Sequence, residues 1–406
     1  MKQFLDKLVK ILRRRMHDWY ASANARMGRK LCRSGEPDAR AVRPVSALHP
    51  AGQAQLDNRL EADFYQLPET RTLPISYPQA DLYHFHKVWA VGDHGNVFLE
   101  DGRLLDVCQF VQRLPSSKIR RPIPFLSQRV RDPVFHLTGF AHDSHGHFIL
   151  NHLPRLMVAL DLLRKEPKIK ILCAFGHSKW QLRYLSRLGI DPQRVIECTN
   201  GTLQIDELFY VPTINGTNNH PDPAIYRAIR DRIVASVFCE LAVPLDQPPR
   251  GNPVFISRAD APDKRISNEA AIIEATRDVL GPVDRLTLSE LSLPQQILKF
   301  NAAPVIIGPV GQGLTNLLFT TGKLAVVLDR GAFKPAGWGA NFRDLAILAG
   351  NRALRFHSGT EYQEGKRHYS FPEEQYRAEL KRLVQCAAAL PNDRLHPLEN
   401  HPPTLR

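Results

Sequence analysis

Strand-like and helix-like segments alternate along two stretches of this chain, and that alternation restricts the fold more than any other feature. In the first stretch, helical spacing up to Leu163 is followed by a buried-type strand at Ile169–Phe175, a helix at Trp180–Leu188 and a strand at Leu208–Val211. Such alternation is typical of α/β domains with a parallel sheet, because parallel strands need crossover helices between them. A chain of 406 residues with 43% hydrophobic content can bury the cores of two such domains.

The second stretch follows a proline-rich segment at residues 244–253, which indicates a domain boundary. We therefore predict an N-terminal α/β domain over residues 60–245, with a β element near 83–105, and a C-terminal Rossmann-like domain over 250–390. The elements of the second stretch are a strand at Val254–Ser257, helices at Glu269–Val279 and Leu293–Phe300, a strand at Pro304–Ile307, a helix at Leu314–Phe319 and a strand at Leu324–Leu328.

The first 33 residues are predicted to form a basic amphipathic helix. Residues 1–60 hold 13 Lys and Arg residues against five Asp and Glu residues, which accounts for +8 of the formal net charge of +13. Apolar residues recur at helical spacing in residues 1–33, a pattern that suits either an anionic membrane surface or docking on the chain's own domain or a partner. We expect a linker rich in Pro, Ala and Gly at 34–59 and a flexible tail at 391–406.

The chain lacks both the roughly 18 unbroken apolar residues of a spanning helix and the apolar centre of a signal peptide. We therefore expect a cytoplasmic protein, peripheral at the inner membrane face where the N-terminal helix binds lipid. The main body has no recurring basic patch interleaved with aromatic residues, so nucleic acid is not an expected partner.

A glycine-rich turn, Gly308–Asn316, follows the apolar run Ala303–Ile307 and precedes a predicted helix. Gly308, Gly311 and Gly313 have no side chains, so the backbone can approach a ligand there, and amide groups at the helix N-terminus can face an anion. A phosphate-bearing ligand fits this pattern, and so does a strand-to-helix turn without a ligand.

Fixed cations follow the first strand of the predicted C-terminal domain. Arg258 comes directly after Ser257, and Lys264–Glu269 adds two more basic side chains. Arginine can grip two phosphate oxygens with its planar fork, while lysine supplies a point charge. A solvated loop paired with its own acidic residues is the alternative. Because this loop and the glycine turn both follow strands of one parallel sheet, we expect them to meet at its carboxyl end.

Four histidines lie between residues 142 and 155 without a recognised zinc spacing, so we do not expect a metal site there. If a helix begins near His147, then His147, Asn151 and Arg155 share one face, which can line a cleft. A neutral imidazole on that face can accept a proton from a hydroxyl nucleophile. Capping or surface contacts account equally well for the other three histidines.

Residues 144–156, 257–269 and 296–316 follow the order and spacing of three motifs of one family. SHGHFILNHLPRL is similar to the motif N-Y-Y-H-W-x-x-E-x-L-P-R-L, the second segment to S-R followed by R-R-x-x-N-E, and GPVGQGLTN to G-x-H-G-x-G-L-T-N. The chain thus resembles glycosyltransferase family 61, which includes many bacterial capsular and exopolysaccharide biosynthesis proteins, over about residues 80–335. The resemblance implies a GT-B arrangement, in which two Rossmann-like domains face a cleft and the C-terminal domain holds a nucleotide sugar.

The resemblance also implies inverting sugar transfer to a glycan or lipid-linked glycan acceptor, without a bound metal or other cofactor. The chain contains no Asp-x-Asp pair, which agrees with this. The helix dipole and the Arg and Lys side chains would then stabilise the leaving diphosphate. The expected base is His147, with Asp143 and Glu269 as substitutes. The predicted donor-binding residues are Arg258, Lys264, Arg265, Asn268, Gly308, Gly311, Gly313, Thr315, Asn316 and Asp329, the last as a partner for ribose hydroxyls, and Asn151 and Arg155 are expected to support the acceptor side.

Three residues depart from the family's pattern. Val310 stands in place of the turn histidine, Asn151 in place of an acid and Phe148 in place of a tryptophan. The first change removes a hydrogen bond to phosphate or acceptor, and the second can leave the catalytic imidazole without an orienting partner. Two alternatives stay open, a non-catalytic sugar-binding or assembly relic of the same fold and an NAD-dependent oxidoreductase. The oxidoreductase fits less well, because its phosphate turn would come late in the chain instead of after a first strand.

Overall fold

The computed structural model describes residues 45–91, 96–102, 104–105, 122, 127–139, 141–175, 179–197, 202–216, 220–245, 247, 249–262, 266–332, 337–359 and 368–389. The predicted basic helix at 1–33, the start of the predicted linker, and the predicted tail at 391–406 lie outside these residues. So do Lys264 and Arg265, two of the predicted donor-binding residues.

The described chain divides into two compact units, and each has the α/β architecture that the alternation predicts. Unit 1 comprises the described residues up to Gln53 and Ser76–Ile233, and unit 2 comprises Ala54–Ile75 and the described residues from Val234 onward. The chain passes from one unit to the other within β2 (Gly52–Asp57), β3 (Thr72–Tyr77) and α7 (Pro223–Glu240).

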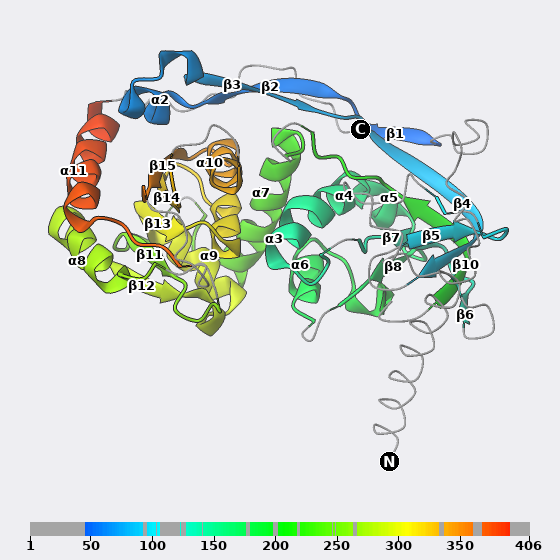
Figure 1. Cartoon of the computed structure of the whole chain (residues 1–406). Helices are drawn as coiled ribbons and strands as arrows, with labels where there is room; N and C mark the ends of the chain where they lie inside the picture. Colours follow the sequence, from blue (N-terminus) through cyan, green and yellow to red (C-terminus); the bar gives the residue numbers. More distant parts are fainter. Residues whose placement is uncertain are drawn as a thin grey trace, which may run out of the picture. The chain divides into compact units, whose positions relative to one another are not determined.

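Unit 1 contains a mixed sheet (Figure 1), in which the described strands run in the order β1-β4-β10-β7-β8-β9, with β5 added to β4 and β6 to β10. β4 and β5 form an antiparallel pair at the position of the predicted β element, whereas β7, β8, β9 and β10 are mutually parallel. The strands are β1 (Ser46–His49), β4 (Ala80–Val91), β5 (Asn96–Leu99), β6 (Ser127–Val130), β7 (Val134–His136), β8 (Lys170–Cys173), β9 (Val195–Glu197) and β10 (Thr202–Tyr210). The helices are α3 (His145–His147), a π-helical turn at Phe148–His152, α4 (Leu153–Val158), α5 (Leu160–Lys165), α6 (Gln181–Arg187) and a 3-10 turn at Pro192–Arg194.

Unit 2 contains a parallel sheet whose described strands run in the order β12-β11-β13-β14-β15. Figure 1 shows α8 and α11 on one face of this sheet and α9 and α10 on the other. The strands are β11 (Val254–Ser257), β12 (Asp284–Thr287), β13 (Val305–Pro309), β14 (Leu324–Asp329) and β15 (Arg352–His357). The helices are α2 (Arg59–Tyr65), α8 (Glu269–Leu280), α9 (Leu293–Ala302), α10 (Trp338–Leu348) and α11 (Glu373–Ala389), with 3-10 turns at Pro68–Thr70, Leu288–Glu290 and Gln312–Phe319.

The arm of residues 54–75, which carries α2, packs into unit 2 although it precedes all of unit 1's parallel strands. Leu60 and Phe64 join the buried apolar cluster formed with β15, α8 and α11. The sequence predicts that residues 46–57 belong to a linker, whereas in the structure they contain β1 and β2. It predicts that residues 60–75 belong to the N-terminal domain, whereas in the structure they belong to unit 2. The partners of α2 lie almost 300 residues further along the chain, as the bonds to Arg355 show, so local sequence does not reveal its docking site.

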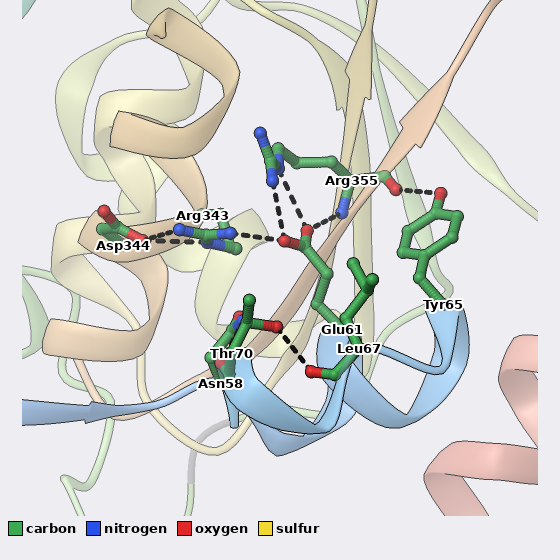
Figure 2. A network of polar contacts seen from close by, with 8 residues as sticks. All are labelled: Asn58, Glu61, Tyr65, Leu67, Thr70, Arg343, Asp344 and Arg355. Atoms are coloured by element: carbon green, nitrogen blue, oxygen red, sulfur yellow. Dashed lines mark hydrogen bonds and ion pairs between the residues drawn. The ribbon is translucent and has the colours of Figure 1, made fainter. Parts of the chain in front are cut away.

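A buried polar network holds α2 against β15, the last described strand of the sheet (Figure 2). Glu61 Oε2 accepts hydrogen bonds from the backbone N–H of Arg355 at 2.9 Å and from its Nε at 3.0 Å, and Tyr65 donates to the carbonyl of Arg355 at 2.6 Å. Glu61 Oε1 accepts from Arg355 Nη2 at 2.8 Å and from Arg343 Nη1, and Arg343 also donates to Asp344. The arm therefore satisfies backbone groups of this strand as well as two buried guanidinium groups.

The network is almost dry, since Glu61, Arg343, Asp344 and Arg355 are each no more than 3% exposed. Burial opposes ionisation of Glu61, but the hydrogen bonds and charges of Arg355 and Arg343 outweigh it and lower its pKa. Removing one partner of such a cluster leaves an uncompensated buried charge, which typically costs about 3–5 kcal/mol. The arm is therefore an integral part of unit 2.

The pKa of His357, at the end of β15, leads to a prediction of how the stability of the chain depends on pH. Burial and the positive charge of Arg355 lower its pKa from 6.5 to about 4. Between these values the unfolded chain binds a proton at His357 that the folded chain does not bind, so folding stability falls as the pH drops through this window. We expect His357→Gln to lose less stability than the wild type between pH 7 and pH 4.5, as measured by urea unfolding at both pH values. Equal losses in the two proteins would show that His357 does not titrate in this way.

Candidate active site

The strand order of unit 2 places a ligand crevice at the carboxyl ends of β11 and β13. These strands are neighbours, but β12 lies on the other side of β11 and β14 on the other side of β13. The chain after β11 leads to α8 on one face of the sheet, and the chain after β13 leads to a 3-10 helix that packs with α9 and α10. Where the strand order reverses in this way, open α/β sheets bind ligands outside the carboxyl ends of the strands.

Arg258 and Gly311 meet at this edge. Arg258 follows β11 directly, and Gly311 lies two residues after β13. A Cβ atom at position 311 would lie 1.9 Å from Nη1 of Arg258 and 2.9 Å from its Cζ, so the guanidinium occupies the space that a side chain would need. The backbone at Gly311 is extended, with φ at 172°, which any residue can adopt. A side chain at position 311 would therefore have to displace the guanidinium, and the structure brings the predicted cation and the predicted glycine turn together.

The other two glycines of the turn face the interior of unit 2. A Cβ atom at Gly308 would lie 2.9 Å from Cβ of Ile256, and one at Gly313 would lie 2.7 Å from Cδ1 of Leu288. Close packing of the chain on itself explains both positions, in contrast to the expectation that all three glycines admit a ligand.

Thr315 and Asn316 are fully buried in the 3-10 helix Gln312–Phe319. Thr315 Oγ1 donates to the carbonyl of Gln312 at 2.6 Å, and Asn316 Nδ2 donates to Oε1 of Gln296 at 2.8 Å. Their side chains thus stabilise the turn, and neither side chain is exposed.

Glu269 and Asn268 fix the loop that carries Arg258. Glu269 Oε1 accepts from Ser257 Oγ at 2.7 Å and from Nη2 of Arg285 at 2.8 Å, while its Oε2 accepts from the backbone N–H of Arg258 at 3.3 Å. Asn268 exchanges two hydrogen bonds with the backbone of Phe371. These contacts make Glu269 an anchor for the end of β11. Nothing in the local sequence marks Arg285, because its pairing with Glu269 depends on β12 lying beside β11.

Asp329 ends β14 at the same carboxyl edge. Its Oδ1 accepts the backbone N–H of Arg330 at 2.9 Å, and burial raises its pKa above the usual value for Asp. The other oxygen, Oδ2, lies so close to the first turn of α10 that a Cβ atom at Gly339 would be 1.9 Å away.

In unit 1, His147 lies at the end of α3, after the carboxyl end of β7. A π-helical turn follows it, and such turns frequently occur at functional sites. Nδ1 of His147 lies 2.9 Å from Oδ1 of Asn151, which is a pure acceptor. Nδ1 therefore carries the proton, and Nε2 is the basic nitrogen of the neutral ring. Asn151 stands where the family's motif has an acid. In the structure it nevertheless orients the imidazole of His147.

Arg155, which was expected on the same face, is buried and holds the strands of unit 1 instead. It donates to the carbonyl of His136, the last residue of β7, at 2.8 Å and to that of Val211, just after β10, at 2.6 Å. Its guanidinium also lies 4.7 Å from the ring centroid of Tyr210. Asp143 is exposed in the turn before α3. The structure thus brings His147 and Asn151 together, while Arg155 supports the neighbouring strand ends.

A surface pocket of about 620 Å³ lies beside α8. It is next to the Arg258 loop in sequence, but its charged groups already pair with one another, Arg285 with Glu269 and Arg277 with Glu274. It is lined by Ala259, Ile266, Ser267, Glu269, Ala270, Ile273, Glu274, Arg277, Arg285 and His368.

Comparison with known families identifies the segment that carries these residues. Residues 145–327 match the family model described as Glycosyltransferase 61. This segment is similar to glycosyltransferases of that family. The matched segment contains the His147–Asn151 pair of unit 1 and both Arg258 and the glycine turn of unit 2.

No curated protein matches this chain. Among solved structures, the flavodiiron protein from Giardia intestinalis is similar at 13% identity and a TM-score of 0.23, a score too low to support any inference. The match covers 46% of this chain and 44% of that protein, so this chain spans less than half of that protein's length.

The helices and the titratable side chains of the described residues also bear on the site. None of the helices found there is long and apolar enough to cross a membrane. The same residues contain no group of three or more His, Cys, Asp and Glu side chains arranged to hold a metal ion.

The glycine contacts predict effects of different size for two similar substitutions. Gly308→Ala forces a new methyl group against Cβ of Ile256, which cannot move without the strand, so we expect a loss of about 1–3 kcal/mol of folding stability. Gly311→Ala meets only the end of a flexible Arg258 side chain, so we expect a change within about 0.5 kcal/mol. Urea unfolding of the two variants checks this, and equal destabilisation would contradict the assigned packing.

Proposed function

We propose that the protein is an inverting, metal-independent glycosyltransferase that moves a sugar from a nucleotide-sugar donor to a polysaccharide or glycolipid acceptor in the synthesis of capsule, exopolysaccharide or another cell-surface glycan. The observation that carries the proposal is the guanidinium of Arg258 lying against the backbone of Gly311 at the β11–β13 edge. The proposal includes the GT-B arrangement, a cytoplasmic location, and binding of residues 1–33 to an anionic membrane surface.

The β11–β13 edge is suited to a diphosphate leaving group. Arg258 supplies a permanent positive charge in a planar fork, and the backbone amide groups after Gly311 point out of the first turn of a 3-10 helix. As the bond between the sugar and the diphosphate breaks, negative charge grows on the phosphate oxygens, and fixed donors stabilise that charge without reorganising. In the proposal Lys264 and Arg265 add to the positive charge, and Asp329 accepts hydrogen bonds from the ribose hydroxyls.

His147 is the proposed base. Its Nε2 takes the proton of the acceptor hydroxyl, whose oxygen attacks the anomeric carbon from the side opposite the diphosphate. The new glycosidic bond forms as the old bond to the phosphate oxygen breaks, and the electron pair leaves with the nucleoside diphosphate. Asn151 keeps the other ring nitrogen protonated and the ring in place. Glu269 is a weaker candidate for this role, because its oxygens already accept from Ser257 and Arg285.

Nucleotide binding tests the donor site. We expect uridine diphosphate or guanosine diphosphate to raise the melting temperature of the wild type without added divalent metal, because a ligand that binds only the folded state stabilises it. Arg258→Ala should lose this shift, whereas Lys299→Ala, which removes a cation paired with Asp284 on the opposite end of β12, should keep it. A shift with NAD and with neither diphosphate would contradict the proposal and favour an oxidoreductase.

The base assignment predicts a graded series of rates. His147→Gln should abolish transfer, and Asn151→Ala should lower kcat about 10–100-fold, as is usual when an orienting partner is lost. Asn151→Asp keeps an acceptor for Nδ1 and should retain more activity than Asn151→Ala. Transfer from the nucleotide sugar found by a donor screen is the measurement, with melting temperature as the control for folding. Wild-type turnover in His147→Gln would reject His147 as the base.

A further inference from the structure

One face of α10 touches both the proposed ribose contact and the buried network. The first turn of the helix packs against the carboxylate of Asp329 at Gly339. Arg343 lies four residues later, and residues four apart share a face of a helix. Arg343 donates a hydrogen bond to Glu61 of the arm (Figure 2). Glu61 and Asp329 are therefore connected through a single helix face.

A second connection between Glu61 and Asp329 runs through β15. Glu61 binds both the backbone N–H and the guanidinium of Arg355. Two residues later, His357 pairs with Asp329 in the β14–β15 register. The backbone N–H of Ser358 also donates to the carbonyl of Asp329 at 3.0 Å. The strand that Glu61 secures is thus the one that supports the backbone of Asp329.

We propose that Glu61 is a positioning residue for nucleoside diphosphate binding, which fixes α10 and β15 so that Asp329 is held at the carboxyl edge of the sheet. The inference rests on the proposed function, since it assumes that a nucleotide occupies that edge. It assigns a functional role to the arm of residues 54–75, which lies outside the segment matched by the family model. Glu61 acts through Arg343 and Arg355 and does not itself touch the ligand.

The charge balance of the network allows folding and positioning to be separated. Glu61 and Asp344 oppose Arg343 and Arg355, so Glu61→Gln alone leaves an excess buried positive charge. Glu61→Gln combined with Arg355→Met leaves Arg343 paired with Asp344, and we expect the double variant to recover much of the melting temperature that the single variant loses. Asp63→Asn is the matched control, because it removes an acid of the same helix that pairs at the surface with Arg71.

The test is the Kd for uridine diphosphate and guanosine diphosphate, measured by calorimetry on the full chain. We expect the double variant to bind the better of the two at least about tenfold more weakly than the wild type, and Asp63→Asn to bind it normally. Asp329→Asn should also weaken binding, and adding it to the double variant should cause little further loss, since both changes act through the same carboxylate. A folded double variant with wild-type Kd, or fully additive losses, would overturn the inference while leaving the proposed function intact. A wild type that binds neither diphosphate would overturn both.

Discussion

The adjacent ends of β11 and β13 determine where the other parts of the candidate site lie. At this point the chain leaves the sheet toward opposite faces, so two loops about 50 residues apart in sequence share one edge. The guanidinium of Arg258 fills the space beside the backbone of Gly311 because position 311 has no side chain. Glu269 and Arg285 hold the loop of Arg258 from the side of β12, and the side chains of Ile256 and Leu288 pack under the glycine turn. A fixed positive charge next to the backbone of the glycine turn follows from these contacts, and it is a suitable environment for a diphosphate.

The second structural constraint is the arm that carries α2. A strand without a neighbour on one side presents unpaired N–H and C=O groups. Glu61 and Tyr65 satisfy such groups of Arg355, and the same carboxylate neutralises two buried guanidinium groups. Unit 2 is consequently assembled from two separated parts of the chain. A fragment limited to the residues matched by the family model would lack this carboxylate, β15, and the two buried arginines Arg343 and Arg355.

The sequence predicts the parts of the fold and site that depend on local pattern. The α/β alternation, the strand before the glycine turn, and the proximity of His147 and Asn151 at four residues apart can all be recognised within short windows. Long-range partners decide the rest. Whether Gly308 admits a ligand or the side chain of Ile256 depends on which strand lies next to β13. The role of Glu269 depends on Arg285 of a neighbouring strand, and the docking of α2 depends on residues near the other end of the chain. Arg155 has the spacing of a residue on the same face as His147, but the carbonyl groups at the ends of β7 and β10 bind its guanidinium in the interior.

The central claim is that the β11–β13 edge binds the diphosphate of a nucleotide-sugar donor. A crystal structure of the protein with uridine diphosphate or guanosine diphosphate tests it most directly. We expect phosphate oxygens within hydrogen-bonding distance of the Arg258 guanidinium and of the backbone amide groups that follow Gly311, with the ribose near Asp329. A nucleotide bound in the pocket beside α8, with Arg258 still lying against Gly311 and no phosphate contact at that edge, would contradict it.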